Sequence, residues 1–126
     1  MIPENVEIFT TEGEKQFYRF LESVAKPDSQ YIVWYTVRPQ QGTGLVITIL
    51  FEHTEDGTGI TKEELLDEAR NSSIGQRLIA EKKCNLTPGH RINRVNVTLG
   101  YLRSKKVFPH KPAVISKGDK LFLNKV

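Results

Sequence analysis

The chain has 126 residues, of which 38% are hydrophobic and 26% charged, with a net charge of +3. This is the composition and length of one ordinary globular domain. No stretch approaches 18 consecutive apolar residues, and the first residues lack the basic and apolar parts of a signal peptide. We therefore expect an intracellular protein, cytoplasmic or located in the nucleoid or nucleus, that does not contact a membrane. The single cysteine, Cys84, excludes an internal disulfide framework and a zinc site built from the cysteines of one chain.

The first 40 residues indicate a small α/β unit. Residues 5–11 favour a short strand or an extended lead-in. Residues 12–25 carry apolar side chains at helical spacing and predict an amphipathic helix that ends at Pro27. Residues 31–37, YIVWYTV, are rich in β-branched and aromatic side chains and predict a strand. We therefore expect residues 1–40 to form a helix-and-strand extension of the domain.

The apolar run LVITILFEH, residues 45–53, is compatible with two structures. Its β-branched content favours a strand, which would pair with residues 31–37 through a loop at residues 39–44. Its length favours a helix, and periodicity does not decide between the two. We favour the helix because a second, clearly marked helix follows after a short link.

That second helix begins after Thr61. Thr61 and Glu64, three residues later, form the pattern of a capping box at the start of ITKEELLDEAR. Residues 71–73 interrupt the helix, and a further helical run continues to about Lys83. Residues 84–90 contain a proline and a glycine and predict a loop.

The stretch RINRVNVTLGYLRSKKVF, residues 91–108, predicts a basic helix over about residues 90–106. Its apolar residues recur at steps of three, four and three, which places them on one buried helix face. The residues of this face are Ile92, Val95, Leu99 and Leu102.

The C-terminal residues predict a β-hairpin. Two short apolar runs, Ala113–Ile115 and Leu121–Leu123, flank a turn that contains Gly118 and Asp119.

The charges are segregated along the chain. Residues 1–81 hold 14 acidic and 7 basic residues, a balance of −7, whereas residues 82–126 hold 11 basic residues and one acidic residue, Asp119, a balance of +10. Polyanion binding is the commonest reason for such segregation. The alternative is that the two parts attract each other or form a complementary dimer surface.

Residues 45–126 resemble the winged helix-turn-helix family. The resemblance is carried by the apolar run ILFEH, the helix ITKEELLDEA, the pattern INRVNVTLGYLRSKKVF and the basic terminal hairpin. The segment from Asn71 to His90 is longer than the usual turn of that family and looks like an inserted helix. The implied fold is α+β: a winged-helix core over residues 45–126, an N-terminal extension over residues 1–40 and a C-terminal wing, all within a single domain, 1–126.

The resemblance implies that the helix over residues 90–106 lies in the major groove of double-stranded DNA while the hairpin over residues 107–126 contacts the DNA backbone. Arginine and asparagine make paired hydrogen bonds to base edges, and lysine suffices for phosphates. The candidate base-facing residues are Arg91, Asn93, Arg94 and Asn96. The other candidate nucleic-acid-binding residues are Thr98, Arg103, Lys105, Lys106, Lys111, Lys117 and Lys120.

We expect no enzyme, no cofactor and no metal site. The best cluster of metal-ligating side chains, from Glu52 to Asp56, adjoins the loop sequence DGTG and favours a solvated helix end. The histidines His90 and His110 have no carboxylate neighbours in the sequence, and the glycine-containing loops lack the spacing and the lysine of a phosphate-binding loop.

The sequence therefore favours a non-catalytic DNA-binding protein, a small transcription regulator, for which a homodimer would suit a palindromic site. Two alternatives stay open. One is a winged-helix module that docks an acidic protein partner in a larger assembly, and the other is a small metal-dependent nuclease.

Overall fold

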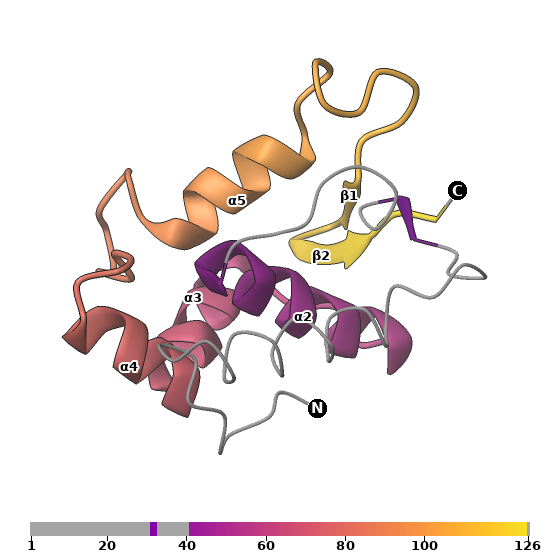
Figure 1. The fold of residues 1–126 in the computed structure, drawn as a ribbon. Coiled ribbons are helices and arrows are strands. Elements are labelled where there is room, and N and C mark those ends of the chain that lie inside the picture. The colour runs from indigo at the N-terminus through magenta and orange to yellow at the C-terminus, as the bar shows by residue number, and fades with distance from the viewer. Residues whose placement is uncertain (1–30, 33–40, 126) are drawn as a thin grey trace, which may run out of the picture.

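A computed structural model describes residues 31–32 and 41–125 of the chain, which form an α+β fold with four helices and a two-stranded antiparallel sheet (Figure 1). The expected strand over residues 5–11, the expected helix over residues 12–25 and most of the expected strand over residues 31–37 lie outside the described residues. Tyr31 forms an isolated antiparallel bridge with Lys125.

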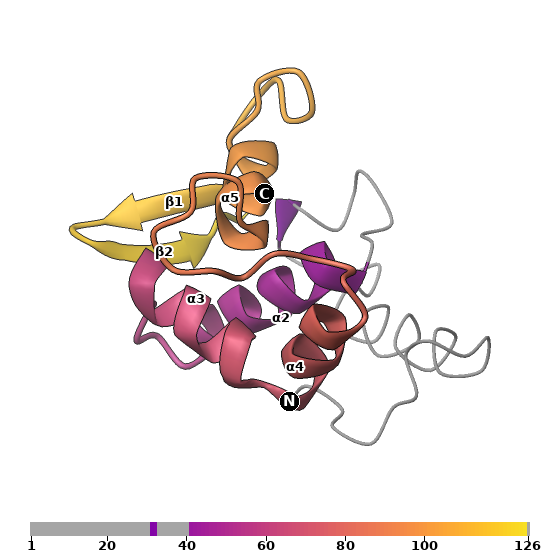
Figure 2. The ribbon, with the colours of Figure 1, turned by 90° about the vertical axis from the view of Figure 1, so that its left-hand side faces the viewer.

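The central element is α2, Gln41–Glu55. The helix expected over residues 45–53 is confirmed, but the loop expected at residues 39–44 is wrong from Gln41 onward because the helix begins there. Every residue from Leu45 to Leu50 is buried, and the Thr48 hydroxyl donates to the Gly44 carbonyl at 2.7 Å. A helix that is apolar on all sides is stable only when other elements surround it, and α2 contacts all three other helices and the second strand (Figure 2).

Two short helices follow, α3 at Lys62–Asn71 and α4 at Ser73–Ala80. The predicted capping box is confirmed, since the Glu64 amide donates to Thr61 Oγ1 at 3.1 Å and the Thr61 amide donates to Glu64 Oε1 at 3.4 Å. Ser72 ends α3 and caps α4 by accepting the Gly75 amide. The second helix ends at Ala80, three residues before the expected Lys83, because the chain turns there and Lys82 adopts a φ of 54°.

The basic helix, α5, covers Arg94–Leu102 and is shorter than the predicted span of residues 90–106. Asn93 adopts an extended conformation and caps the helix, so the residues before it belong to a turn. Ile92 is therefore 71% exposed, and its expected place on the buried face is wrong. The other three residues of that face, Val95, Leu99 and Leu102, are buried as predicted.

The predicted hairpin is confirmed. Its strands are β1, Val114–Lys117, and β2, Lys120–Leu123, and Val114 pairs with Leu123. Gly118 supplies the positive φ of 65° that the tight turn requires. Ile60, in the link between α2 and α3, forms an antiparallel bridge with Leu121 of β2 and donates and accepts one backbone hydrogen bond there.

No helix in the described part of the chain is long and apolar enough to cross a membrane.

Candidate nucleic-acid interface

The outward face of α5 is uncharged and open. The inward side of this helix is buried against the core through Val95, Thr98, Leu99 and Leu102. On the opposite side lie Asn96, Val97 and Gly100, and Val97 is 45% exposed. A Cβ atom placed on Gly100 would meet no heavy atom within 4 Å. The surface of a binding partner could therefore approach this part of the helix closely.

Three asparagine side chains hold the turn that leads into α5. The Asn93 amide group donates to the His90 carbonyl at 2.7 Å, and its Oδ1 accepts the Asn96 backbone amide at 2.8 Å. The Asn96 amide group donates to the Arg91 carbonyl at 3.1 Å and to the His90 carbonyl at 3.5 Å. Asn85 donates to the Ile92 carbonyl at 3.2 Å. This network sets the direction in which Arg91 and Ile92 leave the helix start.

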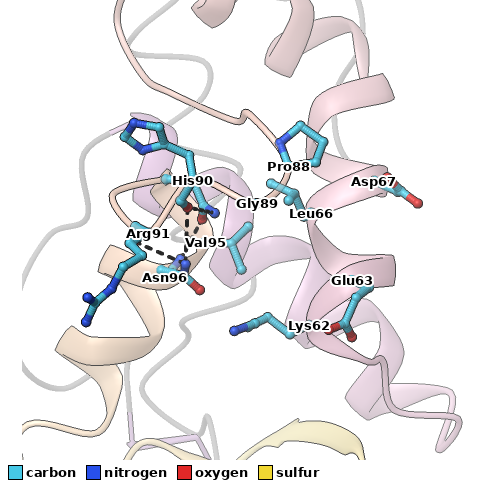
Figure 3. Close-up of a pocket in the computed structure, with 11 residues that line it drawn as sticks. Lys62, Glu63, Leu66, Asp67, Pro88, Gly89, His90, Arg91, Val95 and Asn96 are labelled. Carbon is cyan, nitrogen blue, oxygen red and sulfur yellow. Dashed lines mark hydrogen bonds between the residues drawn. The ribbon is translucent and has the colours of Figure 1, made fainter.

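A pocket of about 370 Å³ lies between α3 and this turn. Leu66 and Val95 are among its apolar lining residues. Figure 3 shows Lys62 extending from α3 toward Asn96, while Asp67 points away from α5. Glu63 and Asp67 also line the pocket. Lys62 is a cation beside the helix start that the sequence analysis missed, because it lies in the acidic part of the chain. Its one sequence signal is its position directly after the capping residue Thr61.

Six of the candidate basic side chains are exposed. Arg91 precedes α5, three others follow it directly, one lies in the loop before β1 and one lies beside the turn of the hairpin. These residues are Arg91, Arg103, Lys105, Lys106, Lys111 and Lys117. In the chain one of them precedes the uncharged face of α5 and five follow it, and exposed cations of this kind can contact the phosphates of a polyanion.

Two of the candidate polar residues are buried, which corrects the prediction that they face nucleic acid. Asn93 is 4% exposed because it caps the helix, and Thr98 is fully buried because it lies on the inward side of α5. Neither side chain offers a surface to a base edge.

Arg94 and Lys120 are also engaged within the fold. The Arg94 side chain packs against the first turn of α2, where a Cβ atom on Gly42 would lie 3.2 Å from Arg94 Nε, and this Nε atom is buried. Lys120 Nζ forms an ion pair with Glu64 Oε1 at 3.2 Å. Arg94 is therefore held against α2 through the inner part of its side chain, and its contact with a base edge stays a prediction. Lys120 already pairs with a carboxylate at the surface.

Cys84 is half-buried beside the helix start. Burial raises the pKa of its thiol, and the nearby Arg94 guanidinium offsets part of this increase. A thiol with a raised pKa is protonated at neutral pH and reacts slowly, so the cysteine adds no nucleophile to the site.

The cluster from Glu52 to Asp56 is used in local hydrogen bonds. His53 Nε2 lies 2.7 Å from Glu68 Oε1 and His53 Nδ1 lies 3.2 Å from Thr58 Oγ1, while Asp56 accepts from the Thr58 amide and hydroxyl. The described residues contain no group of three or more histidine, cysteine, aspartate or glutamate side chains placed to hold a metal ion.

The site thus combines an open, uncharged face of α5 with exposed cations that precede and follow this helix in the chain.

Comparison of the chain with protein-family models, with curated proteins and with solved structures found no match.

Proposed function

We propose that residues 41–125 form a winged-helix domain and that the protein binds double-stranded DNA without catalysis, as a small transcription regulator. The order of elements supports this fold, since α2, the bridging residue Ile60, α3, α5 and the hairpin follow one another as in a winged helix. In this reading α4 is an insertion between the second and third helices, and Ile60 stands for a third, very short strand.

The observation that carries the proposal is the contrast between the two sides of α5. Its inner side is buried, and its outer side, with Asn96, Val97 and Gly100, is uncharged and flanked by exposed cations. A helix of this kind fits the major groove, where the central side chains meet base edges and the surrounding cations meet phosphates. Residues 82–118 contain no carboxylate that would repel the DNA.

The base-facing residues differ from those expected. Because the Asn96 amide group donates to two backbone carbonyls, the paired contact with adenine that needs both polar atoms is not available to it. Asn96 Oδ1 has no partner among the described residues, and it can accept a hydrogen bond from the amino group of adenine or cytosine. Arg91 retains an exposed guanidinium for guanine or phosphate.

We assign the phosphate contacts to the exposed cations that follow α5 in the chain. These are Arg103, Lys105, Lys106, Lys111 and Lys117. Lys62, at the start of α3, adds a cation on the other side of the helix start (Figure 3).

The test is fluorescence anisotropy with a random duplex and with one of its strands, at about 50 and about 200 mM salt. About five phosphate contacts predict a loss of duplex affinity on the order of 500-fold between these concentrations. The variant Lys105→Gln, Lys106→Gln removes two of the contacts and should lower the slope of log affinity against log salt by about two. The control Lys82→Gln, Lys83→Gln removes the same charge at the far end of α4, away from the hairpin (Figure 1), and should leave the slope nearly unchanged.

A second variant tests the orientation of α5. Gly100→Leu places a bulky side chain on the outer face, where nothing lies within 4 Å of the new Cβ. The fold should tolerate it, and duplex affinity should fall more than about tenfold because the helix can no longer approach the bases. An unchanged affinity would show that this face does not meet DNA. Absence of duplex binding at low salt would contradict the whole proposal and point to an acidic protein partner.

A further inference from the structure

Two aliphatic side chains are exposed at the start of α5. Ile92 is 71% exposed and Val97 is 45% exposed, whereas the third exposed large hydrophobic residue of the described chain, Ile79, lies on α4 at 37%. Exposed aliphatic surface is a solvation cost that a partner can remove. Ile92 lies in the turn before the helix and Val97 is the fourth residue of the helix, so both add apolar surface at the start of α5.

A local structural role does not account for this exposure. With Asn93 as the capping residue, Ile92 and Val97 occupy the positions just before the cap and four residues into the helix. These are the positions at which two apolar side chains cover each other in a hydrophobic staple. A staple would withdraw both side chains from water, yet most of the Ile92 surface stays exposed.

The surroundings of this pair restrict its partner. Arg91 and Asn96 are its neighbours in the sequence, and they line a pocket together with Lys62, Glu63 and Asp67 of α3. Residues 82–118 contain no carboxylate, so the segment that holds the pair is positively charged. An anionic partner that also presents small apolar groups fits both the positive charge of residues 82–118 and the two exposed aliphatic side chains. In the major groove of DNA the 5-methyl group of thymine is the apolar group on a base edge, and aliphatic side chains contact it.

We propose that Ile92 and Val97 contact thymine 5-methyl groups, so that the protein prefers duplex DNA with thymines beneath the start of α5. This inference rests on the proposed function and names the DNA class that the site selects. The open space at Gly100, one turn beyond Val97, allows the helix to sit deep enough for both side chains to reach the base edges.

The experiment compares an alternating A·T duplex of about 20 base pairs, two helical turns, with the same duplex in which deoxyuridine replaces every thymine. The replacement removes the methyl groups and keeps the pairing and the phosphate charge. Burial of one methyl group corresponds to about fourfold in affinity, and two correspond to about fifteenfold. The unsubstituted protein should therefore bind the thymine duplex about four- to fifteenfold more tightly.

The variant Ile92→Ser, Val97→Ser is the matched control. It should bind both duplexes with nearly equal affinity and keep the salt dependence of the unsubstituted protein, because the phosphate contacts are unchanged. Its thermal unfolding midpoint shows whether α5 remains folded. A G·C duplex with 5-methylcytosine returns a methyl group to the same position in the groove and should be bound more tightly than its unmethylated form by the unsubstituted protein.

The outcomes separate the two proposals. Salt-sensitive binding with equal affinity for the thymine and uracil duplexes would overturn the methyl contact and leave DNA binding intact. A preference for thymine that persists in the double serine variant would also overturn it, because the preference would then come from the DNA itself. Absence of binding to every duplex at low salt would overturn both.

Discussion

The helices α3 and α5 begin in similar ways and present opposite surfaces. Each has a polar capping residue, Thr61 or Asn93, whose side-chain oxygen accepts an amide of the first turn. The outer side of α3 carries Lys62, Glu63, Glu64, Asp67 and Glu68, a typical solvated face. The outer side of α5 carries neutral side chains and a glycine, with aliphatic surface at its start.

This difference indicates which helix face serves a partner. Charged side chains at helical spacing keep α3 in water at little cost, and its first turn holds two acids that favour the helix dipole. The first turn of α5 holds no acid, and its exposed valine and glycine are poor choices for an isolated helix. A helix face that contributes little to stability and has exposed cations before and after it in the chain is better explained by binding.

Two glycines give the sharpest contrast. In Gly75→Ala the new Cβ would overlap the Ala69 carbonyl oxygen and lie 2.9 Å from Ser72 Oγ. We expect the free energy of unfolding to fall by at least about 3 kcal/mol, because a backbone oxygen cannot move away alone. In Gly100→Ala the new Cβ meets nothing within 4 Å, so the helix should gain about 0.5–1 kcal/mol. Urea unfolding of the full chain measures both, and a destabilised Gly100→Ala would show that the outer face of α5 is covered.

Replacing each of the two capping residues with alanine should lower the free energy of unfolding by different amounts. Thr61→Ala removes the capping box of α3 at an exposed site and should cost about 1 kcal/mol. Asn93→Ala removes a buried cap and also leaves the His90 carbonyl with only the longer hydrogen bond from Asn96, at 3.5 Å, so we expect about 2 kcal/mol. Thermal unfolding compares them. Equal costs would mean that the Asn93 network adds nothing beyond ordinary capping.

Acid should weaken α3 more than α5. Hydrogen bonds from the Thr61 and Lys120 side chains and from the Thr61 backbone hold the pKa of Glu64 below its ordinary value of 4.5. Because the pKa is lower in the folded state, the stabilisation is complete above about pH 4.5 and is lost as the pH falls through the lowered value.

Amide hydrogen exchange locates this effect. Lowering the pH through this window should reduce the protection of α3 amides, corrected for intrinsic exchange, relative to those of α5. Glu64→Gln should remove much of the difference, since glutamine keeps the shape and does not titrate. An equal loss of protection in both helices would place the acid-sensitive group elsewhere.

Local interactions explain what the sequence alone determined. The capping box of Thr61 and Glu64 lies within four residues, so α3 is marked wherever the chain is placed. The hairpin likewise depends on Gly118 and the apolar runs beside it. The segregation of charge is a property of the sequence itself, and it directs attention to residues 82–126.

Which side chains are available at the surface depends on tertiary packing. The apolar run in α2 has no periodicity to decide its structure, and its burial among α3, α4, α5 and β2 makes it a helix. The spacing of the apolar residues within residues 91–102 does not define the residue at which the helix begins. Because Asn93 caps α5, Ile92 leaves the buried face while Thr98 stays on it, and the Arg94 side chain packs against the first turn of α2.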